Sequence, residues 1–171
     1  MVVLRATRKV LATLPASPVA AARSDTALGD WYLNRVVVDR RPLLLLVSST
    51  SLLSLVVPAR DVRGLSNRLA DLVGTRLERL GIGPRTIELE TRAMSPVAIG
   101  PTVDRSVLGI MVDFAKSLPY FLEPGQWDDT TLRTAEDKLA ETPCFAGRSF
   151  AETVFPDKKA PELLLAKWEV N

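Results

Sequence analysis

Two short segments of the sequence hold side chains that could bind or transform an anionic ligand. The first brings a carboxylate, two adjacent aromatic rings, an amide and a guanidinium to the expected start of a strand: Asp30, Trp31, Tyr32, Asn34 and Arg35. Neighbouring residues of a strand face opposite sides, so Tyr32 and Asn34 share one face and Trp31 and Arg35 share the other. Buried Trp and Tyr need hydrogen-bond partners, which Asp30 or Asn34 could supply. The segment is therefore either a strand start capped by a Gly-Asp turn or part of a binding surface.

The second segment lies at the expected start of a helix and contains four polar residues and one glycine: Asp104, Arg105, Ser106, Gly109 and Asp113. Helical spacing places Ser106, Gly109 and Asp113 on one face. The first N–H groups of a helix have no intrahelical partner, and the helix dipole favours anions there. Arg105 and Ser106 could thus form a phosphate or carboxylate pocket at the helix N-terminus. The alternative is that Asp104 caps the helix and pairs with Arg35 or another arginine, in which case its carboxylate repels an anion.

Both segments contain runs that resemble motifs of a known family. The matching residues are Leu28, Gly29, Asp30, Trp31, Tyr32 and Asn34 in the first and Arg105, Ser106, Val107, Leu108, Gly109, Met111 and Asp113 in the second. They resemble the Leu-Gly-Asp-Trp-Tyr-Ala-Asn and Asn-Arg-Ser-Val-Leu-Gly-Ser-Met-Asn-Asp stretches of a family of uncharacterised bacterial proteins, a domain of unknown function. Leu33, Asp104, Ile110 and Val112 depart from these motifs, and the last three stand where the family has polar residues. The resemblance covers residues 1–143 or so and implies no particular activity.

The sequence contains no histidine and a single cysteine. Histidine is the usual proton shuttle near neutral pH and the commonest metal ligand. A Ser-His-Asp triad, a Cys-His pair and a His-based zinc site are therefore excluded. Any catalysis would depend on carboxylates and arginines: Asp30, Asp104 and Asp113 could hold a divalent cation, with Arg35 and Arg105 stabilising charge. These residues do not single out a metal site or a cofactor.

The composition is that of a globular protein, with 47% apolar residues, 25% charged residues and a formal net charge of +2. Residues 1–105 hold 15 Lys or Arg against 9 Asp or Glu, whereas residues 106–171 hold 7 against 11. The arginine-rich first part is either a solvated surface or a face that binds anions or nucleic acid. The longest apolar run, Leu43–Val47, is far shorter than the roughly 20 residues that cross a bilayer. The charges near the N-terminus follow the apolar residues, whereas in a signal peptide they precede them. A lone Cys144 forms no intramolecular disulfide, and we expect its thiol to be inert. We therefore expect a bacterial cytoplasmic protein without membrane contact.

The secondary structure expected from hydrophobic spacing is a mixture of short strands and helices. Strands are expected over residues 1–6, 33–38, 43–48, 52–57, 86–91 and 97–101. Helices are expected over residues 7–14, 61–80, 104–118, 131–141 and 161–168. In the 61–80 helix, Asp61 is the expected N-cap, and polar residues opposite the apolar stripe, among them Arg68 and Arg79, are expected to face solvent. Pro119 is expected to end the 104–118 helix, and Pro161 to begin the last one.

These elements predict one α+β domain, with a mainly antiparallel sheet of five or six strands packed against two principal helices. The domain is expected to span residues 1–142. Residues 143–171 are expected to form a C-terminal segment that wraps the domain or contacts a partner.

The leading functional hypothesis is a binding or regulatory module that recognises an anionic ligand, a nucleic acid or a partner protein through the two polar segments. One alternative is a histidine-free hydrolase or phosphodiesterase that uses Asp and Arg with a divalent cation. Another is an oligomeric scaffold, or the neutralising half of a two-component system, that uses the C-terminal segment as an arm. The residue pattern is compatible with an enzyme and with a non-enzyme, and with a homo-oligomer. Whether the two polar segments share a pocket depends on the fold.

Overall fold

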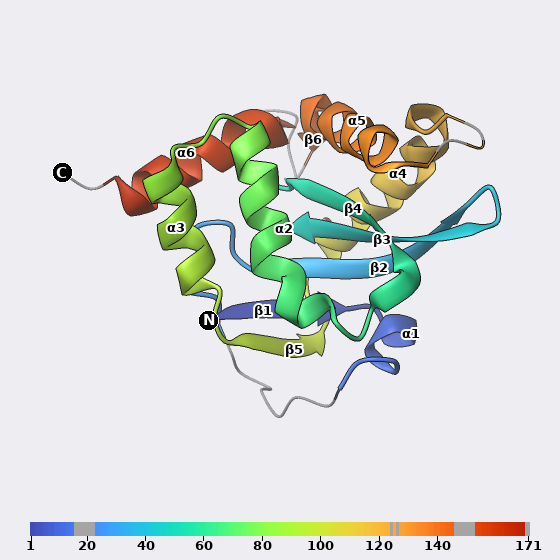
Figure 1. The fold of residues 1–171 in the computed structure, drawn as a ribbon, viewed down its shortest axis with the longest axis horizontal. Coiled ribbons are helices and arrows are strands. Elements are labelled where there is room, and N and C mark those ends of the chain that lie inside the picture. Colours follow the sequence, from blue (N-terminus) through green and yellow to red (C-terminus); the bar gives the residue numbers. More distant parts are fainter. Residues whose placement is uncertain (16–22, 124, 126, 146–152, 170–171) are drawn as a thin grey trace.

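A computed structural model describes residues 1–15, 23–123, 125, 127–145 and 153–169 of the chain. Its main sheet has five strands in the order β4-β3-β2-β1-β5 (Figure 1). The strands are β1 Val2–Ala6, β2 Trp31–Val38, β3 Arg41–Ser48, β4 Ser54–Pro58 and β5 Val97–Pro101. Strands β2, β3 and β4 follow one another through short turns and pair antiparallel, whereas β1 pairs parallel with both β2 and β5. The sheet is therefore mixed, with the first strand of the chain in its interior.

Strand β3 shows why the sheet is covered on both faces. Its leucines alternate between two apolar cores: Leu44 and Leu46 belong to one, and Leu43 and Leu45 belong to the other. All four side chains are at most 2% exposed. Such a continuous apolar run is what a strand buried on both sides requires.

Helices form the two outer layers. Helix α2 Leu65–Arg79 crosses in front of the sheet in Figure 1, α3 Pro84–Ala93 lies beside α2 at the left, and α4 Arg105–Phe121 passes behind the sheet. Helix α5 Asp129–Glu141 lies along the outer edge of β4, and α6 Pro156–Trp168 packs on α3 and α5. The remaining elements are α1 Arg8–Leu11, the 3₁₀ turn η1 Ala59–Asp61, and the small pair of strands β6 Cys144–Phe145 and β7 Thr153–Val154. Within the described ranges, no helix is both long and apolar enough to cross a bilayer.

The predicted single α+β domain is confirmed, and its main sheet has five of the expected five or six strands. The sheet was expected to be mainly antiparallel, but it is mixed, because β1 pairs parallel with both of its neighbours. Residues 86–91, expected as a strand, instead lie in helix α3. The alternation of two apolar and two acidic residues over this stretch is too short to separate a strand from a helix. Thr86 and Glu90, four residues apart on the helix, are its buried positions. Glu90, which a strand would have turned to solvent, is fully buried.

Three expected helix ends are also corrected. Helix α2 begins at Leu65 after η1, with Gly64 rather than Asp61 in the N-cap position. Pro119 lies inside α4 and Pro161 lies inside α6. Each proline removes one intrahelical hydrogen bond, but the adjacent turns are held by fully buried residues, Leu118 in α4 and Ala160 and Leu164 in α6.

Candidate functional site

The two polar segments meet at one hydrogen bond on the α4 side of the sheet. The N–H of Asp104 donates to the hydroxyl of Tyr32 at 3.1 Å. Tyr32 is buried in the core beneath α4, whereas Trp31 is fully buried in the opposite core. The indole N–H of Trp31 has no hydrogen-bond partner among the residues that the structure describes. The two adjacent rings therefore anchor β2 from both faces.

Asp30 is bound on three sides by neighbouring groups. Its carboxylate accepts hydrogen bonds from Arg5 Nε at 2.5 Å and from Ser24 Oγ at 2.6 Å. Its N–H donates to Ser49 Oγ at 2.9 Å. Arg5 also donates to the carbonyl of Pro101 at 3.2 Å. Through these two bonds Arg5 connects Asp30 with the end of β5. Arg5 is the partner that the sequence analysis missed, although a single arginine within the apolar first strand is a signal for a paired side chain.

The remaining predicted site residues are half-buried or exposed. Asn34 Oδ1 accepts hydrogen bonds from Thr7 Oγ1 and from the N–H of Arg35, both at 2.9 Å. Four of the predicted residues are exposed: Arg35, Arg105, Ser106 and Asp113. The structure thus joins Tyr32 to the α4 segment, keeps Asp30 paired with Arg5, and leaves Arg35, Arg105 and Asp113 on open surface.

Asp104 caps the start of α4, as one alternative predicted, but no ion pair with Arg35 or another arginine is seen among the described residues. Asp104 Oδ1 accepts hydrogen bonds from the N–H groups of Ser106 at 2.8 Å and Val107 at 3.4 Å. These bonds satisfy the donors that an anion would have used. Asp113, two turns further along, lies close enough to Cys144 to influence its ionisation. In the part of the chain that the structure describes, no group of three or more Asp, Glu or Cys side chains is placed to hold a metal ion.

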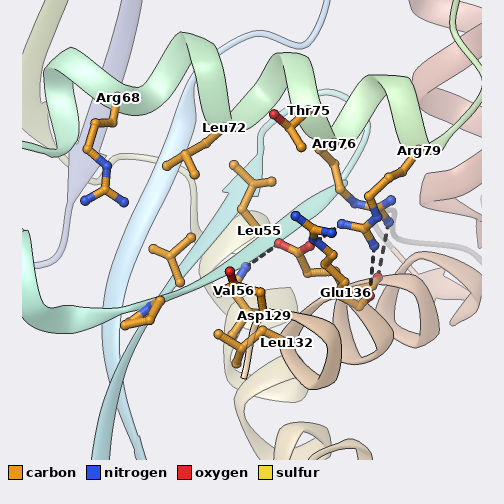
Figure 2. Close-up of a pocket in the computed structure, with 13 residues that line it drawn as sticks. Leu55, Val56, Arg68, Leu72, Thr75, Arg76, Arg79, Asp129, Leu132 and Glu136 are labelled. Carbon is orange, nitrogen blue, oxygen red and sulfur yellow. Dashed lines mark hydrogen bonds and ion pairs between the residues drawn. The ribbon is translucent and has the colours of Figure 1, made fainter. Parts of the chain in front are cut away.

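The described residues form a different, arginine-lined pocket where α2, β4 and α5 meet (Figure 2). Its volume is about 260 Å³. Four arginines line it: Arg68, Arg76 and Arg79 from α2 and Arg133 from α5. Two carboxylates, Asp129 and Glu136, and an apolar floor that includes Leu55, Leu72 and Leu132 complete it. We refer to this cavity as the arginine pocket.

Glu136 is the central carboxylate of the arginine pocket. One oxygen accepts a hydrogen bond from the N–H of Val56 at 2.8 Å, and the other accepts one from Arg79 Nη1 at 2.7 Å. Burial raises the pKa of Glu136 above its ordinary value, although the hydrogen bonds from Arg79 and Val56 and the charge of Arg76 oppose this shift. Arg79 also pairs with Asp137 at 2.5 Å. Both oxygens of Glu136 are therefore already occupied by donors.

Arg76 is the most buried charged group of the pocket, with 1% of its surface exposed. Its Nη2 donates to the carbonyl of Glu136 at 3.3 Å. Its Nη1 lies 3.1 Å from Asp137 Oδ1, which is ion-pair distance without hydrogen-bond alignment. Neither Nε nor Nη1 has a hydrogen-bond partner among the described residues. Burial lowers the pKa of Arg76, against the opposing charges of Glu136, Asp137 and Asp157.

A family model for a domain of unknown function, DUF6933, matches residues 3–159. The chain belongs to the DUF6933 family. The match includes both polar segments and the whole arginine pocket, so all of these features are parts of the DUF6933 domain. The expected membership of a family of unknown function is confirmed. A comparison with the curated proteins finds no match.

The arginine pocket of this DUF6933 domain was missed from the sequence for two reasons. Arg68 and Arg79 were expected to face solvent, but Arg79 is only 22% exposed and is paired with Glu136. The spacing of Arg68, Leu72, Arg76 and Arg79 along α2 is a usable signal, because it places all four on one side of the helix. The acidic partner Glu136 lies 57 residues beyond Arg79, and no local pattern connects them.

Cys144 is expected to be almost unreactive in the folded DUF6933 domain. It is 3% exposed, and burial, together with the charge of Asp113, raises the pKa of its thiol to about 11. The thiolate is the reactive form. Labelling with a disulfide reagent at mildly alkaline pH should therefore be at least about 100-fold slower in the folded protein than in urea. Fast labelling of the native protein would show that this part of the chain opens readily.

Proposed function

We propose that this protein is a binding module for a small ligand carrying an oxyanion, such as a phosphate or a carboxylate, which binds in the arginine pocket. The observation that carries the proposal is Arg76, a guanidinium that is 1% exposed and lines a pocket. Among the described residues its Nε has no hydrogen-bond partner, and its Nη1 has only the unaligned ion pair with Asp137. Burying such a charge costs several kcal/mol unless it is fully paired. A ligand anion would supply the missing acceptors.

The balance of donors and acceptors around the pocket supports the same proposal. Four arginines line it, against the carboxylates of Asp129 and Glu136. Glu136 is occupied by Arg79 and Val56, and the same oxygen of Asp137 is shared by Arg76 and Arg79. Guanidinium groups bind phosphate and carboxylate oxygens in a planar, two-pronged geometry. An oxyanion therefore matches the pocket in charge and in hydrogen-bond type.

Calorimetric titration of the full chain with inorganic phosphate and sulfate tests the proposal. The exposed rim arginines are varied singly, as Arg68→Gln and Arg133→Gln, and Arg85→Gln on the surface of α3 is the control with the same change in charge. Each rim variant should weaken binding about tenfold, which is the effect of losing one charge-assisted hydrogen bond. The control should bind as tightly as the parent. Equal losses in all three variants would indicate general charge attraction and overturn the proposed pocket.

Sulfate binding is also expected to become tighter as the pH is lowered. Protonation of Glu136, whose pKa is raised by burial, removes one negative charge beside Arg76 and Arg79. Sulfate remains a dianion, so its affinity should rise several-fold from neutral to acidic pH. Glu136→Gln should bind sulfate tightly at both pH values and lose this dependence. A parent protein whose affinity does not change with pH would show that Glu136 does not face the ligand.

We further expect the protein to act in a bacterial cytoplasm, where a single unpaired cysteine stays reduced. A nucleic acid or a partner protein could present the same phosphate or carboxylate groups to the arginine pocket. The salt dependence of binding to generic RNA and DNA tests the first of these.

A further inference from the structure

A second pocket adjoins the arginine pocket. Pro58 and Leu132 line both cavities, so the two lie side by side along the end of β4. The second cavity has a volume of about 330 Å³. Its other lining residues are Arg41, Pro42, Leu43, Ala59, Arg60 and Trp127. We refer to it as the tryptophan pocket.

The tryptophan pocket offers flat surfaces and hydrogen-bond donors. The guanidinium carbon of Arg41 lies 5.4 Å from the centroid of the Trp127 ring, which is cation–π distance. Three polar side chains line the cavity, those of Arg41, Arg60 and Trp127, and all of them carry donors without acceptors. The buried indole N–H of Trp127 has no hydrogen-bond partner in the described part of the chain. A planar ring with acceptor atoms at its edge is the chemical group that this cavity fits.

From these adjoining cavities we propose that the ligand is a nucleotide, with its phosphate in the arginine pocket and its base in the tryptophan pocket. The inference rests on the proposed function, because it assigns the oxyanion to the same four arginines. Nucleobases stack on aromatic rings and on guanidinium planes, and their ring nitrogens and carbonyl oxygens accept hydrogen bonds. Arg41 is exposed, so a base can stack on the outer face of its guanidinium. Each cavity then has the chemistry of one half of the ligand, and buried donors without partners are found in both.

A series of three ligands tests the inference on the full chain by calorimetry at low salt. Inorganic phosphate probes the arginine pocket alone, ribose 5-phosphate adds the sugar, and nucleoside 5′-monophosphates add the base. The monophosphates should bind at least tenfold more tightly than ribose 5-phosphate. If phosphate and ribose 5-phosphate bind but the base adds nothing, the nucleotide inference is overturned and the proposed function stands. If none of the three binds, both are overturned.

Variants test whether one ligand uses both cavities. Arg41→Gln should reduce the preference for a monophosphate over ribose 5-phosphate, and Arg40→Gln, the neighbouring exposed residue outside the pocket, should preserve it. In Trp127→Leu the ratio of the affinities for the monophosphate and for ribose 5-phosphate should fall close to one. Thermal unfolding checks that this variant is folded. Arg68→Gln should weaken both ligands equally and leave the preference unchanged. If Arg68→Gln weakened the binding of ribose 5-phosphate but not that of the monophosphate, the two cavities would bind separate ligands. This result would overturn the inference.

Discussion

Replacing Glu90 with leucine is expected to lower the free energy of unfolding by about 3–5 kcal/mol. The fully buried carboxylate accepts hydrogen bonds from the N–H groups of Ala27 at 2.9 Å and Leu28 at 3.0 Å, and from Trp168 Nε1 at 2.6 Å. It thus joins α3 to the segment before β2 and to the end of α6. Leucine has a similar volume, but it leaves two buried donors and one partly buried donor without an acceptor. Urea unfolding followed by circular dichroism measures the loss.

The matched control for this experiment is Glu88→Leu on the same helix. Glu88 is exposed, and among the described residues its carboxylate pairs with Arg92 alone, one turn away. Such surface pairs contribute about 0.5 kcal/mol or less. Glu90→Gln should fall between the two, because its amide oxygen can accept while its NH₂ group opposes the donors that remain. If Glu88→Leu and Glu90→Leu lost equal stability, the three hydrogen bonds that Glu90 accepts would not stabilise the fold as the structure indicates.

Replacing Gly29 with alanine is expected to cost about 2–4 kcal/mol. Gly29 has a φ of +68°, and a Cβ there would lie 2.5 Å from Ser49 Oγ and 2.7 Å from Thr50 Cγ2. Ser49 cannot move aside without breaking the bond that its hydroxyl accepts from the N–H of Asp30. Backbone strain and a steric clash therefore act together at this position.

Gly81→Ala separates these two contributions. Gly81 has a φ of +80°, but nothing lies within 4 Å of an added Cβ. This variant should therefore show the strain alone, about 1 kcal/mol. Thermal unfolding of the two variants side by side gives the difference. A Gly29→Ala variant as stable as Gly81→Ala would mean that the turn before β2 adjusts freely.

Much of the fold follows from patterns that are local in the sequence. The apolar run of β3 predicts a strand covered on both faces, and Asp104 followed by an amphipathic stretch predicts the start of α4. The side-chain alternation of β2 predicts that Trp31 and Tyr32 enter opposite cores, as they do. In each case the deciding interactions lie within one element or between adjacent strands.

What the sequence could not predict depends on contacts between distant residues. Helix α3 was expected as a strand because two apolar and two acidic residues alternate in its sequence. The partners that hold Glu90 in the interior, Ala27 and Trp168, lie 63 and 78 residues away from it. The arginine pocket requires α2 to meet α5 across the edge of β4, which hydrophobic periodicity does not show. The parallel pairing of β1 likewise depends on the path of the chain after β4, which carries it back to the far edge of the sheet as β5.

The position of Glu136 also bears on the outer edge of the sheet. Strand β4 is an outer strand of the sheet, and the unpaired backbone groups of such a strand are templates for sheet growth between molecules. Glu136 accepts a hydrogen bond from the outward-facing N–H of Val56, and α5 lies along the strand. A strand from another molecule would have to displace a buried carboxylate that is held by Arg79. One side chain therefore both lines the arginine pocket and occupies a backbone donor at the edge of the sheet, which disfavours fibre-like strand addition there.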